Sequence, residues 1–109
     1  MITCFLKYQI DPNKLKEFEQ YGKEWIDLVN KMGGIHHGYL LPHEGPNNIA
    51  YASFSFPSLV DYEIYRKQID RNEHCQKVLD EAKKSGCIIS YERSFMKPLF
   101  EGFTDKAKI

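Results

Sequence analysis

Apolar and polar positions alternate in the first segment of the chain, and this period of two predicts a β-strand. In residues 2–10 every second side chain, from Ile2 to Ile10, is apolar or aromatic, so this strand offers one side to a core. Further strands are expected at about residues 36–41, 49–56 and 88–96. The turn Gly-Pro-Asn-Asn at 45–48 joins the second and third strands as a hairpin, and it serves most simply as a plain connector.

A helical period of three to four residues follows the first strand. Asp11 can cap a helix that has Pro12 in its first turn, and the pair Gly33-Gly34 can adopt the left-handed end of that helix. The positions that would face the core are Leu15, Phe18, Gly22, Trp25, Val29 and Met32. We therefore expect one long amphipathic helix with Trp25 buried against a sheet.

Two shorter helices are expected between the third and fourth strands. Ser58 and Asp61 have the spacing of a capping box, which opens the first of them. Its expected buried positions are Leu59, Tyr62, Tyr65 and Ile69. The second helix should cover about residues 72–84 and end at Gly86.

The order strand, helix, strand, strand, helix, strand predicts an α+β fold of the ferredoxin-like βαββαβ type, with an antiparallel sheet. We expect one domain at residues 1–99 and a C-terminal tail at 100–109. Helices cover only one face of such a sheet, yet aromatic or apolar residues occur on both sides of most strands. Because monomers seldom expose a large apolar patch, we expect a sheet-to-sheet homodimer. The alternative is a monomer with a face of half-exposed tyrosines.

Composition restricts the partners and the compartment. Lys plus Arg equal Asp plus Glu at 15 each, so no net field favours nucleic acid or an anionic membrane as a partner. No apolar run reaches the roughly 20 residues needed to cross a bilayer. Cys4, Cys75 and Cys87 are odd in number and widely spaced, which favours structural thiols and a cytoplasmic location.

Several blocks of the sequence together resemble a known family. They are MITCFLKYQI with DPNKLKEF, the stretch from MGGIHHGYL to YRKQID, and ISYERSFMKPL. Their most specific positions are the Gly-Gly pair, Gly38, the Gly45–Asn47 turn, Ser58, Tyr65 and Arg66. The chain is similar in these blocks to the NIPSNAP family, within the dimeric α+β barrel superfamily.

The resemblance implies a ferredoxin-like protomer whose sheet pairs with that of a second copy into a barrel around a cavity. It does not imply one reaction, because the superfamily includes cofactor-free oxygenases, haem-degrading enzymes, isomerases, decarboxylases and members without known activity.

Three of the four histidines lie in the predicted hairpin, which raises the question of a metal site. His36 and His37 are neighbours on a strand and should point to opposite faces, while His43 is roughly 20 Å from His37 along an extended strand. One chain therefore cannot bring them to one ion, and no metal is expected. Hydrogen-bonded hairpin histidines are the simpler interpretation, and a ligand pair across the dimer is the alternative.

Candidate chemistry rests on polar side chains in strands that could line a cavity. No nucleotide, zinc-protease or hydrolase motif occurs, and we expect no cofactor. Strict alternation allows either His36 or His37 to face the cavity, and we favour His37 with Tyr39 as catalytic candidates. The candidate ligand-binding residues are Tyr51, Ser53, Tyr91 and Arg93.

Each candidate also has a structural alternative. The tyrosines could simply pack, Arg93 could pair with Glu92, and Arg66 could reach Asp70 one helical turn on. Two functions therefore stay open. The first is a protein that binds a small apolar or aromatic molecule, such as a cofactor-free oxygenase or isomerase. The second is a non-catalytic dimeric module whose aromatic faces serve assembly.

Overall fold

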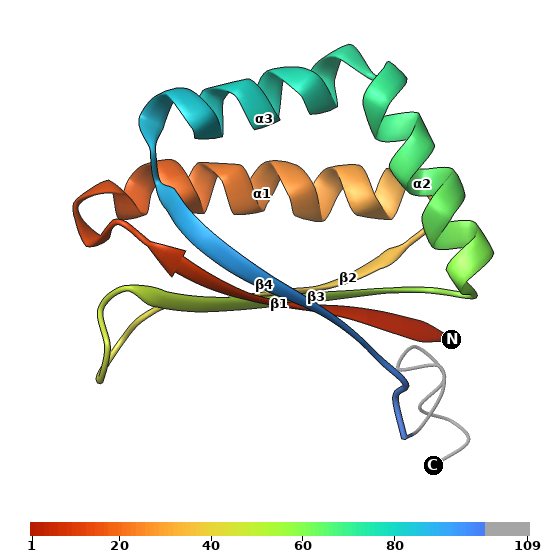
Figure 1. Cartoon of the computed structure of the whole chain (residues 1–109), viewed down its shortest axis with the longest axis horizontal. Helices are drawn as coiled ribbons and strands as arrows, with labels where there is room; N and C mark the ends of the chain where they lie inside the picture. The colour runs from red at the N-terminus through yellow and green to blue at the C-terminus, as the bar shows by residue number, and fades with distance from the viewer. Residues whose placement is uncertain (100–109) are drawn as a thin grey trace.

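A computed structural model describes residues 1–99 of the chain, and the expected tail at 100–109 lies outside the described residues. The described part holds a four-stranded sheet with its helices gathered on one side (Figure 1). In chain order the elements are β1 (Ile2–Ile10), a 3-10 turn (Pro12–Lys14), α1 (Leu15–Lys31), β2 (Ile35–Leu40), β3 (Ile49–Phe56), α2 (Leu59–Arg71), α3 (Glu73–Ser85) and β4 (Ile88–Met96).

The strands are ordered β2-β3-β1-β4, and every neighbouring pair is antiparallel. This is the expected ferredoxin-like α+β fold, and the prediction is confirmed. The central strand β1 places Leu6 opposite Ala52 of β3 and opposite Arg93 of β4. Residues of three strands that share this row therefore point to the same face of the sheet.

The core lies between the sheet and α1. Alternate residues of β1 and β3 point toward the helices, and Ile10 and Phe56 are among the most completely buried. Phe18 and Val29 of α1 are fully buried against them, and Trp25 is 7% exposed, as the helical period predicted. Gly22 allows α1 to approach β2 closely, because a Cβ atom there would lie 3.2 Å from the ring of Tyr39.

The helix ends follow the capping chemistry of the sequence. The Asp61 N–H donates to Ser58 Oγ at 3.2 Å, which is the first half of the expected capping box. Asn72 caps α3 by accepting from the Cys75 N–H at 3.0 Å, and Gly86 ends that helix with a positive φ. Only Leu59 departs from the expected buried positions of α2, because it stays 52% exposed.

Strand β2 is irregular at a point that controls the direction of its side chains. His36 pairs with Phe54, but the next pair is Gly38 with Ser53, so His37 is an extra residue. Gly38 has a φ of +100°, a conformation that glycine adopts without steric cost. This β-bulge shifts the alternation by one residue, and His36 and Tyr39 therefore both point toward the helices.

The opposite face of the sheet is free of helices in the described part of the chain (Figure 1). It is less aromatic than the sequence suggested, because Tyr39, Tyr91 and Phe95 all point toward the helices. Phe5 and Tyr51 remain on the open face, with ring centroids 5.7 Å apart. Within residues 1–99, no helix is long and apolar enough to cross a membrane.

Candidate functional site

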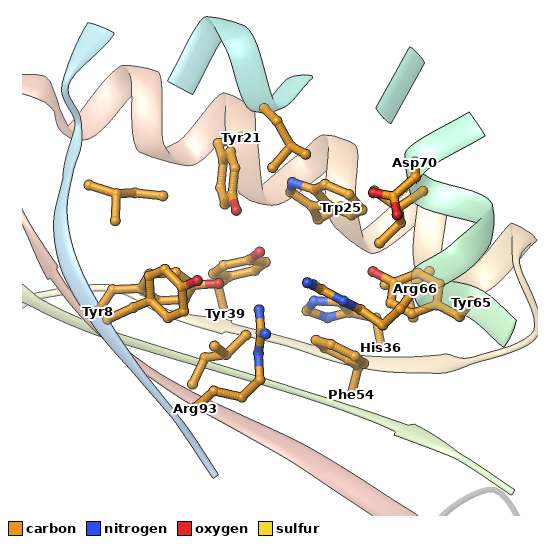
Figure 2. A pocket seen from close by; sticks show the side chains of 16 residues that line it. Tyr8, Tyr21, Trp25, His36, Tyr39, Phe54, Tyr65, Arg66, Asp70 and Arg93 are labelled. Atoms are coloured by element: carbon orange, nitrogen blue, oxygen red, sulfur yellow. The ribbon is translucent and has the colours of Figure 1, made fainter. Parts of the chain in front are cut away.

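A pocket of about 220 Å³ lies between the sheet and the three helices, within a single protomer (Figure 2). Its apolar lining is Leu6, Val29, Phe54, Ile69, Leu79 and Ile88. Its polar or aromatic lining is Tyr8, Tyr21, Trp25, His36, Tyr39, Tyr65, Arg66, Asp70, Tyr91 and Arg93. This volume is large enough for a compound of one or two aromatic rings, since a cavity of about 150 Å³ can hold benzene.

Tyrosine rings form one wall of the pocket. The rings of Tyr8 and Tyr39 stack with centroids 6.1 Å apart, and Tyr91 lies 6.2 Å from Tyr8. Burial, reinforced by the neighbouring phenols, raises the pKa of Tyr8 and Tyr39 above the ordinary value. Burial likewise raises the pKa of Tyr21 to about 12. All three hydroxyls are therefore protonated at neutral pH and can donate hydrogen bonds.

His36 is held firmly in the lining of the pocket. Its ring stacks on Tyr39 at 5.1 Å and on Phe54 at 5.6 Å, and its Nδ1 accepts a hydrogen bond of 2.9 Å from the Gly38 N–H. Burial, with a smaller effect from the neighbouring His37, lowers the pKa of His36 to about 4. The ring is thus neutral at pH 7, and because Nδ1 is an acceptor its proton is on Nε2. His36 therefore offers the pocket a donor and not a base.

Trp25 contributes a second donor. Among the described residues, its buried Nε1 has no hydrogen-bond partner. Figure 2 shows the indole ring beside the space that the labelled side chains enclose. An unpaired polar group in a protein interior costs about 1–3 kcal/mol, so this N–H would gain from an acceptor in the pocket.

Two arginines lie at the exposed side of the pocket. Arg66 comes from α2 and Arg93 from β4, and their guanidinium groups point into the same space (Figure 2). The Arg93 guanidinium lies 5.4 Å from the centroid of the Tyr91 ring, a cation–π contact. Within residues 1–99, neither arginine forms an ion pair with a carboxylate within 4.0 Å. The alternative pairings of Arg66 with Asp70 and of Arg93 with Glu92 are therefore absent there.

The residues singled out from the sequence divide between the two faces of the sheet. Tyr39, Tyr91 and Arg93 line the pocket together. Tyr51 and Ser53 lie on the open face, where they pair with Lys7 and Phe5 of β1. Their expected roles in ligand binding stay predictions that concern that open face.

His37 also lies on the open face. Its Nε2 is 2.7 Å from Ser55 Oγ, and Ser55 Oγ is 2.7 Å from Thr3 Oγ1. The expectation that His37 and Tyr39 share one face is wrong, because the bulge at His37 breaks the strict alternation on which it rested. His36 takes the place beside Tyr39. No group of three or more potential metal ligands occurs within residues 1–99.

Sequence reasoning did not assign Tyr8, Tyr21, Trp25 or Tyr65 to a site. Each lies at a core-facing position of a strand or helix, and from the sequence alone such a residue is most simply explained as packing. One pattern was available: Tyr21 and Trp25 are four residues apart on one helix face, so their polar groups reach the same region.

Solved structures similar to this chain include several of unestablished function. One is the protein Atu4242 from Agrobacterium tumefaciens, with 20% identity, a TM-score of 0.79, and coverage of 93% of this chain and 96% of that chain. An uncharacterised NIPSNAP-like domain protein from Burkholderia xenovorans has 20% identity, a TM-score of 0.73, and coverage of 93% and 87%. A putative antibiotic biosynthesis monooxygenase from Nitrosomonas europaea has 9% identity, a TM-score of 0.70, and coverage of 92% and 100%.

At these identities the likeness shows the shared fold. No curated protein matches the chain. The sequence model of the NIPSNAP family matches residues 4–100, which is nearly the whole length, and confirms the resemblance noted from the glycine positions and the hairpin. The chain belongs to the NIPSNAP family.

Proposed function

We propose that this NIPSNAP protein binds a small, mainly apolar or aromatic molecule that carries a carbonyl or anionic oxygen, in the pocket between sheet and helices. The observation that carries the proposal is a pocket of about 220 Å³ that is lined by Trp25, whose buried indole N–H lacks a partner within residues 1–99. Apolar and aromatic walls suit the body of such a ligand, and the N–H suits its oxygen.

Donors dominate the polar groups of the pocket. The indole of Trp25, the imidazole Nε2 of His36 and the buried tyrosine hydroxyls all donate, and Arg66 and Arg93 donate without being able to accept. Such an array stabilises a negative oxygen better than a neutral one. It is therefore suited to an enolate or a phenolate, the species that a cofactor-free oxygenase or an isomerase would form from its substrate.

A reaction of that kind also needs a proton acceptor. His36 is a poor choice, because its pKa is about 4 and its Nδ1 already accepts from Gly38. Asp70 is the one carboxylate among the residues that line the pocket in the described chain. We therefore place proton acceptance, if the bound molecule is turned over, at Asp70 and not at a histidine.

We further propose that the protein is a homodimer that pairs through its open sheet face and acts in the cytoplasm. Phe5 and Tyr51 form an aromatic pair on that face, and Leu40 and Met96 are 71% and 51% exposed there. A second copy would cover these groups, as expected for the dimeric α+β barrels. The three cysteines, which are buried and free, fit a reducing compartment.

A non-catalytic dimeric module is the second candidate. The same open face supports this candidate, because two copies could assemble through it without any role for the pocket. The two candidates differ in what they require of Trp25 and His36, since a structural module needs no ligand at these side chains. Ligand binding at these side chains therefore separates them.

Ligand binding should raise the melting temperature. In a thermal-shift screen of aromatic ketones, amides and acids, a compound present at about 100 times its Kd should stabilise the protein by about 2.7 kcal/mol, a rise of several degrees. Trp25→Phe and His36→Ala should each lose at least half of that rise for the best compound, because each removes a donor from the pocket.

The matched control is His37→Ala, since His37 is the next residue but lies on the other face of the sheet. This variant should keep the full rise. An equal rise in all four proteins would place the compound outside the pocket and refute the proposed site.

The dimer can be tested by light scattering. At micromolar concentration the scattering mass should be about twice the 12.8 kDa of the chain. Tyr51→Glu should reduce it to the chain mass, because it puts a charge into the proposed interface. Ile64→Glu, at a site on α2 that is 50% exposed, should leave the dimer intact. A parent protein that scatters as a monomer contradicts the proposal.

Acid should weaken the fold through His36. Its pKa is lower in the folded state than in the unfolded chain, so the unfolded chain takes up the proton first. Stability is therefore complete above pH 6.5 and declines as the pH falls toward about 4. Urea unfolding at pH 7 and pH 4.5 should show that the parent loses about 2 kcal/mol more than His36→Phe, which keeps the ring stack but cannot titrate. The same loss in both proteins would mean that His36 does not titrate as described.

A further inference from the structure

Resting on the proposed function, we infer that the ligand is an aromatic monocarboxylic acid, whose carboxylate is bound at the mouth of the pocket between Arg66 and Arg93.

The first support is the local charge. Two guanidinium groups and one carboxylate line the pocket, while the chain as a whole has a formal net charge of +0. The local excess of positive charge is thus a feature of this site and not of the whole surface. Within residues 1–99 neither guanidinium is neutralised by an ion pair, so both are available to an anion.

The second support is the arrangement of the two side chains. They come from different elements, α2 and β4, yet both reach into the same space (Figure 2). The Arg93 guanidinium lies over the Tyr91 ring, and a cation–π contact of this kind leaves the positive charge able to attract an anion. A planar guanidinium edge matches the two oxygens of a carboxylate, and an amide or ester lacks the charge for this contact.

The rest of the pocket restricts the molecule behind that carboxylate. Phe54, Leu6 and Val29 offer an apolar surface, and the volume of about 220 Å³ is enough for a body of one or two rings. Asp70 lines the same pocket and would repel a second negative group. A ligand with one carboxylate and an otherwise uncharged aromatic body fits the arginines, the apolar walls, the volume and the position of Asp70.

The test compares two probes of the same shape, 2-naphthoate and 2-naphthamide, by isothermal titration calorimetry with the full chain. The naphthoate should bind at least about tenfold more tightly, because a hydrogen bond to a charged group contributes more than one to a neutral group. Arg66→Gln and Arg93→Gln should each weaken naphthoate binding about tenfold and change naphthamide binding less than about twofold.

Arg71→Gln is the matched control, because Arg71 lies on the same helix but outside the pocket, and it should bind both probes like the parent. Equal affinity of the parent for both probes would overturn the inference and leave the proposed function standing. Unchanged naphthoate affinity in the Arg66→Gln, Arg93→Gln double variant would also overturn it. Failure of the parent to bind either probe would contradict the proposed function together with the inference.

Discussion

The burial of one face of the sheet against α1 is the interaction on which the rest of this molecule depends. Ile10 and Phe56 of the sheet and Phe18 and Val29 of α1 are almost fully removed from water, and such burial stabilises by about 1.5–3 kcal/mol for each large apolar side chain. Since neighbouring strand residues point to opposite faces, a shift of one residue in the pairing of a strand would turn all of its buried side chains toward the open face. This packing therefore fixes the strand register, and the register fixes which side chains meet in the pocket.

Much of the fold could be predicted because local chemistry and long-range packing agree. The alternation of residues 2–10 predicts β1 and its buried side, and the Ser58–Asp61 box marks the start of α2. The bulge in β2 could not be predicted in the same way. Gly38 can adopt a positive φ, but a glycine in a strand does not always do so. Only the pairing with β3 shows that His37 is the extra residue.

The candidate site was less accessible to sequence reasoning than the fold. Tyr91 and Arg93 could be singled out because they are polar residues on a predicted strand, whereas Trp25 and Tyr21 resembled ordinary core residues of a helix. What distinguishes Trp25 is that its buried N–H has no partner within residues 1–99, and a missing partner is visible only after the chain has folded. Neutral His36, tyrosines of raised pKa and two arginines that form no ion pair within residues 1–99 complete a pocket rich in hydrogen-bond donors, which suits an oxygen of a ligand.

The central claim is that the indole of Trp25 donates to a bound molecule. The chain holds one tryptophan, so a nitrogen-15 correlation spectrum contains a single indole N–H signal that needs no assignment. Saturating 6-hydroxy-2-naphthoate, which carries a second oxygen on the ring far from its carboxylate, should move this signal and slow the exchange of its proton with water, because the N–H gains an acceptor in the pocket. An indole signal that keeps its position and exchange rate while calorimetry shows the site to be filled would contradict the account.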